Sequence, residues 1–125
     1  MELAVVGTGG FLGAIGRYVV TGLMHRRFPG FLPAGTLAVN LIGCLAIGVL
    51  MELVIQQKLS AGPWRLFVVT GLLGSLTTFS AFGYETVELM REEDFRRALW
   101  NVTGNVLLGC AAVAAGMAVV RVLAR

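Results

Sequence analysis

Four long apolar runs, separated by short clusters of charged residues, constrain this chain more than any other feature of its sequence. The runs cover about residues 3–24, 33–55, 64–90 and 95–120. Each exceeds the roughly 20 residues that a helix needs to cross a bilayer. Soluble domains carry charge on about a quarter of their residues, whereas 14% of these 125 residues are charged. The pattern predicts an all-α membrane protein, with one domain of four transmembrane helices spanning residues 1–125.

Basic residues flank the apolar runs and give the chain a net charge of +3. This position favours contact with anionic membrane lipids over nucleic acid. Four spans put both termini on one side, which holds four cations against five on the other. So small a difference is a weak orientation signal. It fits insertion in both orientations as well as a single orientation set by other details. The two groups are Lys58, Arg65, Arg121 and Arg125 on the terminal side, and Arg26, Arg27, Arg91, Arg96 and Arg97 on the other.

A second copy of the chain is the expected partner. Four helices enclose little space, so a polar pathway is built more easily between two subunits than within one. Gly9 and Gly13 form a GxxxG pair, a spacing that supports close contact between membrane helices. We therefore predict a homodimer, which the weak orientation signal allows to be antiparallel.

Three asparagines interrupt the apolar runs: Asn40 in the second, and Asn101 and Asn105 in the fourth. Polar groups in a span usually face protein, water or a substrate, because lipid cannot satisfy them. Asn101 and Asn105 share one helical face, whereas Asn40 fits a pathway residue and an interhelical contact equally well. With no carboxylate expected to be buried beside them, these amides indicate a hydrogen-bonding track and not a proton relay.

The third run contains the stretch GLLGSLTTFSAFGYET at residues 71–86, in which hydroxyl side chains are crowded. Ser75, Thr77 and Thr78 fit two structures. They can satisfy backbone groups freed by a helix break, or they can bond to the preceding turn of an unbroken helix. A break would expose carbonyl oxygens that suit a cation.

Phe79 and Phe82 lie three residues apart and can face the same way. Such rings usually face lipid or the protein core. The positive edge of a ring also suits an anion, which it attracts without the strength of a full charge. For Arg17 in the first run and Glu85 in the third, we expect structural or vestibule roles.

Three stretches together resemble one family: GGFLGAIGRY (9–18), GTLAVNLIGCLAIG (35–48) and GLLGSLTTFSAFGYE (71–85). They are similar to the Fluc, or CrcB, fluoride channels, across essentially all four spans. The resemblance implies an antiparallel, dual-topology homodimer in the plasma membrane, whose two pores pass fluoride passively out of the cell. It also implies a third helix broken at mid-membrane. A structural sodium ion would lie at the dimer centre, held by the backbone carbonyls of Gly74 and Thr77 from both subunits.

The same resemblance implies a fluoride path past Phe79, Phe82, Asn40 and Ser80. The chain departs from the family at Ala81, where many relatives carry a hydroxyl, and at two positions in the fourth span. There, Asn101 and Asn105 stand where relatives often have Tyr and Ser. Amide N–H groups also donate to anions, so we include both in the path. Thr78 is grouped with Arg17 and Glu85 as vestibule or structural.

Two other functions fit a small four-helix chain. A proton-coupled multidrug exporter relies on a glutamate deep in the first helix, and the only acid in that span is Glu2, at its start. A noncatalytic membrane assembly subunit would use its polar residues only to join helices. An enzyme is not expected, since the sequence shows no nucleophile–base pair, metal cluster or phosphate loop.

Overall fold

The computed structural model describes residues 1–30, 33–60 and 62–124, and every regular element within these ranges is helical. Four helical spans are long and apolar enough to cross a membrane. They confirm the predicted all-α membrane fold, with boundaries within a few residues of those expected from hydropathy. The spans are Glu2–Arg27, Ala34–Ile55, Leu66–Arg91 and Phe95–Leu123.

The third and fourth spans are each divided into shorter helical elements. Two of these, η1 and η2, are π-helical, a wider helix that occurs as short segments inside α-helices, frequently at functional sites. The Gly74 N–H, for example, donates to the Val69 carbonyl five residues back. In chain order the elements are α1 (Glu2–Arg27), α2 (Ala34–Ile55), η1 (Leu66–Leu73), α3 (Gly74–Leu76), α4 (Phe79–Arg91), α5 (Phe95–Thr103), η2 (Gly104–Leu108) and α6 (Gly109–Leu123).

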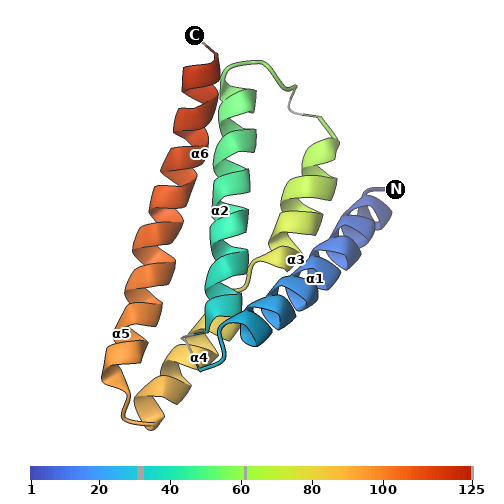
Figure 1. The fold of residues 1–125 in the computed structure, drawn as a ribbon. Helices are drawn as coiled ribbons and strands as arrows, with labels where there is room; N and C mark the ends of the chain where they lie inside the picture. Colours follow the sequence, from blue (N-terminus) through green and yellow to red (C-terminus); the bar gives the residue numbers. More distant parts are fainter. Residues whose placement is uncertain (31–32, 61, 125) are drawn as a thin grey trace.

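α2 and α6 run side by side in the same direction along the length of the subunit (Figure 1). Glycines allow their backbones to meet: a Cβ on Gly48 would collide with the Val113 carbonyl, and one on Gly116 with the backbone of Leu45 and Val49. Small residues at this spacing let membrane helices approach closely. The pair forms a rigid support for the polar residues of the second and fourth spans.

α1 packs along η1, the first part of the third span (Figure 1). Here the contact uses the predicted GxxxG pair, because a Cβ on Gly9 would meet the Phe67 carbonyl and one on Gly13 the Leu72 carbonyl. Both glycines are buried within the subunit. The pair therefore joins two helices of one chain, and a homodimer needs other support.

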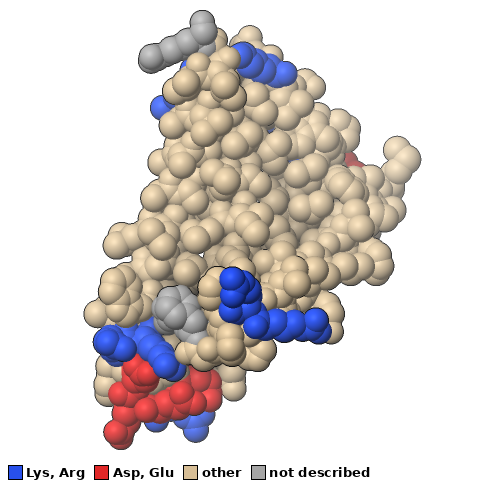
Figure 2. All heavy atoms as spheres, viewed as in Figure 1, with Lys and Arg blue, Asp and Glu red and all other residues tan. Residues whose placement is uncertain are grey.

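The outer surface between the two ends of the molecule is largely apolar. Most Lys, Arg, Asp and Glu side chains gather toward the two ends in Figure 2 and leave an uncharged band between them. Inside, Val39, Leu73 and Leu76 form a small buried core where α2 meets the third span. So much exposed apolar surface is compatible with lipid as the surrounding solvent, and the chain is a multi-pass membrane protein. Arg125, one of the cations counted for orientation, lies outside the described residues.

Candidate functional site

The third span is interrupted between α3 and α4. Thr77 (φ −79°, ψ 156°) and Thr78 (φ −151°, ψ 118°) both have extended backbone. Threonine suits this conformation because its branched Cβ is readily accommodated in extended chains. The neighbouring helix leaves room for it: a Cβ on Gly43 of α2 would collide with the Thr77 Cγ2. The interruption lies within the hydroxyl-rich stretch.

Two backbone N–H groups next to the interruption bond to side chains. In an unbroken helix, the N–H of Thr78 would donate to the Gly74 carbonyl and that of Ala81 to the Thr77 carbonyl. Instead, the Thr78 N–H donates to Asn40 Oδ1 at 2.8 Å, and the Ala81 N–H to Thr78 Oγ1 at 3.2 Å. The carbonyls of Gly74 and Thr77 thus lose their helical donors, and these are the two carbonyls that sequence resemblance assigned to a cation.

The Asn40 amide contacts both the interruption and the fourth span. Its Nδ2 donates to the Thr78 carbonyl at 3.2 Å and to Asn105 Oδ1 at 2.8 Å. Together with the bond from the Thr78 N–H, these contacts occupy both amide hydrogens and the amide oxygen. Asn40 is therefore an interhelical contact in this subunit, and it also lies at the wall of the cavity described below.

From Asn40 a row of amides continues along the fourth span. Asn105 Nδ2 donates to the backbone carbonyl and to Oδ1 of Asn101, both at 3.0 Å. Asn101 is only 2% exposed, and its Nδ2 donates to Thr86 Oγ1 on α4 at 3.0 Å. The Thr86 hydroxyl then donates to the Phe82 carbonyl at 2.7 Å. We call Asn40, Asn105 and Asn101 the amide row; it joins three spans through hydrogen bonds.

The two phenylalanine rings lie beside this row. Their centroids are 5.4 Å apart and their planes meet at 61°, an edge-to-face pair. Phe79 is 81% exposed in the single subunit. An open cavity of about 440 Å³ is lined by both rings, by Asn40 and Asn105, and by the residues at the interruption. The two rings and two of the amides thus share one wall of polar and apolar groups.

Not every predicted path residue lines this cavity. Asn101 lies behind Asn105, in the buried part of the amide row. Ser80 is exposed on the first turn of α4, and its hydroxyl lies 3.2 Å from Thr78 Oγ1. Both therefore contact residues of the cavity wall without forming that wall themselves.

A second cavity of about 390 Å³ lies where the end of α1 and the start of α2 meet α4. Glu85 lines it, and Glu85 Oε1 accepts a hydrogen bond from the Thr36 hydroxyl at 2.6 Å. Tyr18 and His25 lie on the same wall. Arg17 is half-buried on α1 and lines neither of these two cavities.

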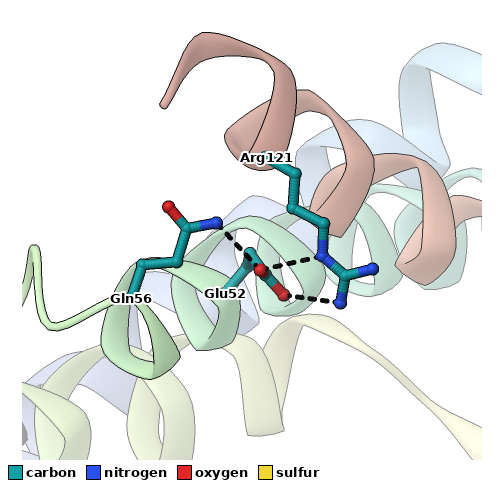
Figure 3. Close-up of polar contacts among 3 residues, drawn as sticks. All are labelled: Glu52, Gln56 and Arg121. Carbon is teal, nitrogen blue, oxygen red and sulfur yellow. Dashed lines mark hydrogen bonds and ion pairs between the residues drawn. The ribbon is translucent and has the colours of Figure 1, made fainter. Parts of the chain in front are cut away.

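One buried carboxylate contradicts the expectation that membrane amides occur here without one. Glu52 on α2 is 3% exposed. It is held by Arg121 of α6, whose Nε and Nη2 donate to its two oxygens at 2.9 and 3.1 Å, and by Gln56 Nε2 at 2.9 Å (Figure 3). The paired guanidinium makes burial tolerable. The sequence signal for this pair is a lone acid, Glu52, within an apolar run; Arg121 has the position of an ordinary flanking cation.

The comparisons with known proteins agree with this architecture. Residues 4–117 match a family described as "CrcB-like protein, Camphor Resistance (CrcB)". The chain belongs to the CrcB family. Since the match covers all but the ends of the chain, it includes the interruption, the amide row and both cavities.

Several relatives carry a functional name. The chain is 40% identical over 121 residues to the "Fluoride-specific ion channel FluC" of Clostridium novyi, covering 95% of this chain and 86% of the relative. It is 45% identical over 109 residues to the protein of that name in Methanocaldococcus jannaschii, covering 87% of this chain and 85% of the relative. It is 42% identical over 115 residues to the Sulfurovum sp. protein of the same name, covering 92% of this chain and 90% of the relative. These CrcB relatives are named as channels and not as enzymes.

Proposed function

We propose that this chain is a fluoride channel that passes fluoride down its gradient, out of the cell. The observation that carries the proposal is the shared wall of the first cavity, where an edge-to-face pair of rings adjoins the amide row. The names of the relatives agree with it. A proton-coupled exporter is not favoured by these names, nor is an assembly subunit.

The wall offers what passage of fluoride requires. Fluoride is small and strongly hydrated, so it enters an apolar band only where other donors replace its water. Positive ring edges of Phe79 and Phe82 attract an anion weakly, and amide hydrogens can donate to it. Several weak sites in a row allow an ion to leave as readily as it enters, which conduction needs. Asn40 and Asn105 line the cavity and would exchange a hydrogen bond within the amide row for one to the ion. Asn101 and Ser80 would support the path from behind this wall, through their contacts with Asn105 and Thr78.

A second, antiparallel copy of the chain would complete the path. α4 has no residue buried by its own subunit among those described, and the Phe79 ring is largely exposed. Phe79 and Phe82 of this helix also line the cavity, as expected of a path built between two subunits. The near-equal count of cations on the two sides supports antiparallel insertion. Two such subunits form two pores.

The residues at the interruption fit a structural sodium ion at the dimer centre. Carbonyl oxygens of unwound helices are suitable ligands for Na⁺ in membranes. The Gly74 and Thr77 carbonyls qualify because their helical donors bond elsewhere, and Gly74 is exposed at the subunit surface. The same pair from each subunit would hold the ion, which would supply a fixed charge that joins the two chains.

Fluoride efflux from liposomes tests the role of the rings. Purified wild type, Phe79→Ala and Phe82→Ala are reconstituted at equal density, and fluoride release is read with an electrode. We expect rapid loss with the wild type and a large decrease with each variant. Leu107→Ala, an exposed residue on η2 that lines neither cavity described above, is the control. Full flux in both phenylalanine variants would contradict the ring mechanism.

A further inference from the structure

Asn40 pairs with both polar atoms of the Thr78 backbone, accepting from its N–H at 2.8 Å and donating to its carbonyl at 3.2 Å. We propose that Asn40 is a positioning residue that holds the interruption of the third span open. By occupying the Thr78 N–H, it keeps the Gly74 carbonyl free of its helical donor. This inference deepens the proposed function, because it makes the site for the structural cation depend on one side chain of another helix.

A Gly74–Ser75 pair and the π-helical η1 lie just before the interruption, and both are features that can bend a helix. The extended backbone itself lies after them, at Thr77 and Thr78, which are neither proline nor glycine. Threonine tolerates extended backbone but does not require it. At membrane depth, a Thr78 N–H without a partner would cost several kcal/mol, whereas return to the helix would satisfy it. The Asn40 amide removes this penalty because its oxygen accepts from the Thr78 N–H, while its nitrogen donates to the Thr78 carbonyl. A neighbouring β-strand would contact the backbone in the same way.

Contacts around Thr77 also favour the interrupted helix, but they do not supply a partner for the Thr78 N–H. The Thr77 hydroxyl donates to the Leu73 carbonyl at 3.0 Å, and Gly43 provides space for its methyl group. These contacts fix the side chain of Thr77 and leave the Thr78 peptide to Asn40. Thr78 is 8% exposed, so water does not readily take the place of the amide.

The same contact fixes the direction of the amide row. A backbone N–H can only donate, so Asn40 must turn Oδ1 toward Thr78 and Nδ2 toward Asn105. Asn105 consequently presents Oδ1 to Asn40 and Nδ2 to Asn101. Asn40 thus connects the backbone at the interruption with the amide row, whereas the Asn105 side chain bonds only to other members of that row. This difference provides the matched control.

The test compares Asn40→Leu with Asn105→Leu in the full chain, purified in micelles. Labelling threonine with ¹³C reports backbone conformation through the Cα shifts of Thr77 and Thr78. Dimer content measured against NaCl concentration, with constant ionic strength from N-methylglucamine chloride, reports the cation site. We expect Asn40→Leu to move both Cα shifts to helical values and to lose the Na⁺ dependence. We expect Asn105→Leu to retain both properties and to lose fluoride flux.

Asn40→Asp keeps the test decisive if Asn40→Leu does not fold. It retains an oxygen that accepts from the Thr78 N–H and loses the amide donor, so we expect extended shifts with decreased flux. Extended shifts and intact Na⁺ dependence in Asn40→Leu would overturn the inference, as would helical shifts in folded Asn40→Asp. If the wild type shows no Na⁺ response while Asn40→Leu still becomes helical, the sodium proposal fails and the positioning role stands.

Discussion

The Thr36 hydroxyl donates to Glu85 Oε1 at 2.6 Å, while Glu85 Oε2 is buried and has no hydrogen-bond partner among the described residues. Thr36 lies one helical turn before Asn40, so a single face of α2 contacts the third span at Glu85 and at Thr78. α4 is thus held to α2 by polar contacts, with no buried apolar residue of its own in the described subunit.

Glu85→Gln should fold at least as stably as the wild type. The glutamine oxygen still accepts from Thr36, and a neutral amide group takes the place of the buried carboxylate oxygen, so no charge lies at this position in the membrane span. Thr36→Val, in contrast, leaves Glu85 without its donor and should lower the free energy of unfolding by about 1 kcal/mol. Unfolding by denaturant in mixed micelles measures both. A Glu85→Gln variant clearly less stable than Thr36→Val would show that the carboxylate itself is required.

Arg121→Ala should lower the melting temperature strongly. It leaves Glu52, which is 3% exposed, without its cation. The Arg121 side chain is itself 58% exposed, so the loss comes from the buried carboxylate, and removing only the partner of a buried charge is more harmful than removing both groups. The double variant Glu52→Leu/Arg121→Leu should therefore recover much of the lost stability. Arg96→Ala, an exposed cation on α5, controls for loss of charge. Equal melting temperatures for Arg121→Ala and Arg96→Ala would mean that the pair shown in Figure 3 contributes little.

Gly43→Ala should disturb the interruption of the third span and decrease flux. The added Cβ collides with the Thr77 methyl group, whereas an added Cβ at Gly7 has nothing within 4 Å. Gly7→Ala is therefore the matched control. Thr77→Ser removes the colliding methyl and keeps the hydroxyl, so Gly43→Ala/Thr77→Ser should regain flux. Liposome assays of the four variants provide the comparison, and full flux in Gly43→Ala alone would argue against this contact.

Asn101→Leu should destabilise the chain by about 1 kcal/mol, the usual size of an interhelical hydrogen bond in a membrane. It removes the donor to Thr86 and the side-chain acceptor for Asn105. Steric trapping or denaturant unfolding measures the change. Because Thr86 retains its bond to the Phe82 carbonyl, the fold should survive. A variant as stable as the wild type would show that the hydrogen bonds of Asn101 contribute no net stability.

Much of the fold follows from hydropathy alone, because a span that is too short or too polar cannot lie in hydrocarbon. The hydroxyls of Thr77 and Thr78 fitted a broken and an unbroken third helix equally well, and the structure has extended backbone at both residues. Asn101 and Asn105 were placed on one face by their spacing, and the structure joins them through a hydrogen bond.

Contacts between spans could not be predicted in the same way. Hydropathy does not determine how far one helix slides along another, so the pairing of Glu52 with Arg121 and of Asn40 with Thr78 was not foreseen. Likewise, GxxxG predicts a close contact without naming the partner, and Gly9 and Gly13 contact η1 of the same subunit. Which helices meet, and at which residues, depends on side-chain packing between the helices.

The most direct test of the central claim measures fluoride and chloride efflux from liposomes that contain only this protein. Valinomycin with K⁺ permits counter-ion movement, and no pH gradient is supplied. We predict rapid fluoride loss with negligible chloride loss, since the path offers weak, dispersed donors suited to a small anion. Absence of fluoride loss from verified, folded dimers, or equal loss of both ions, would contradict the proposal of a passive fluoride-selective channel.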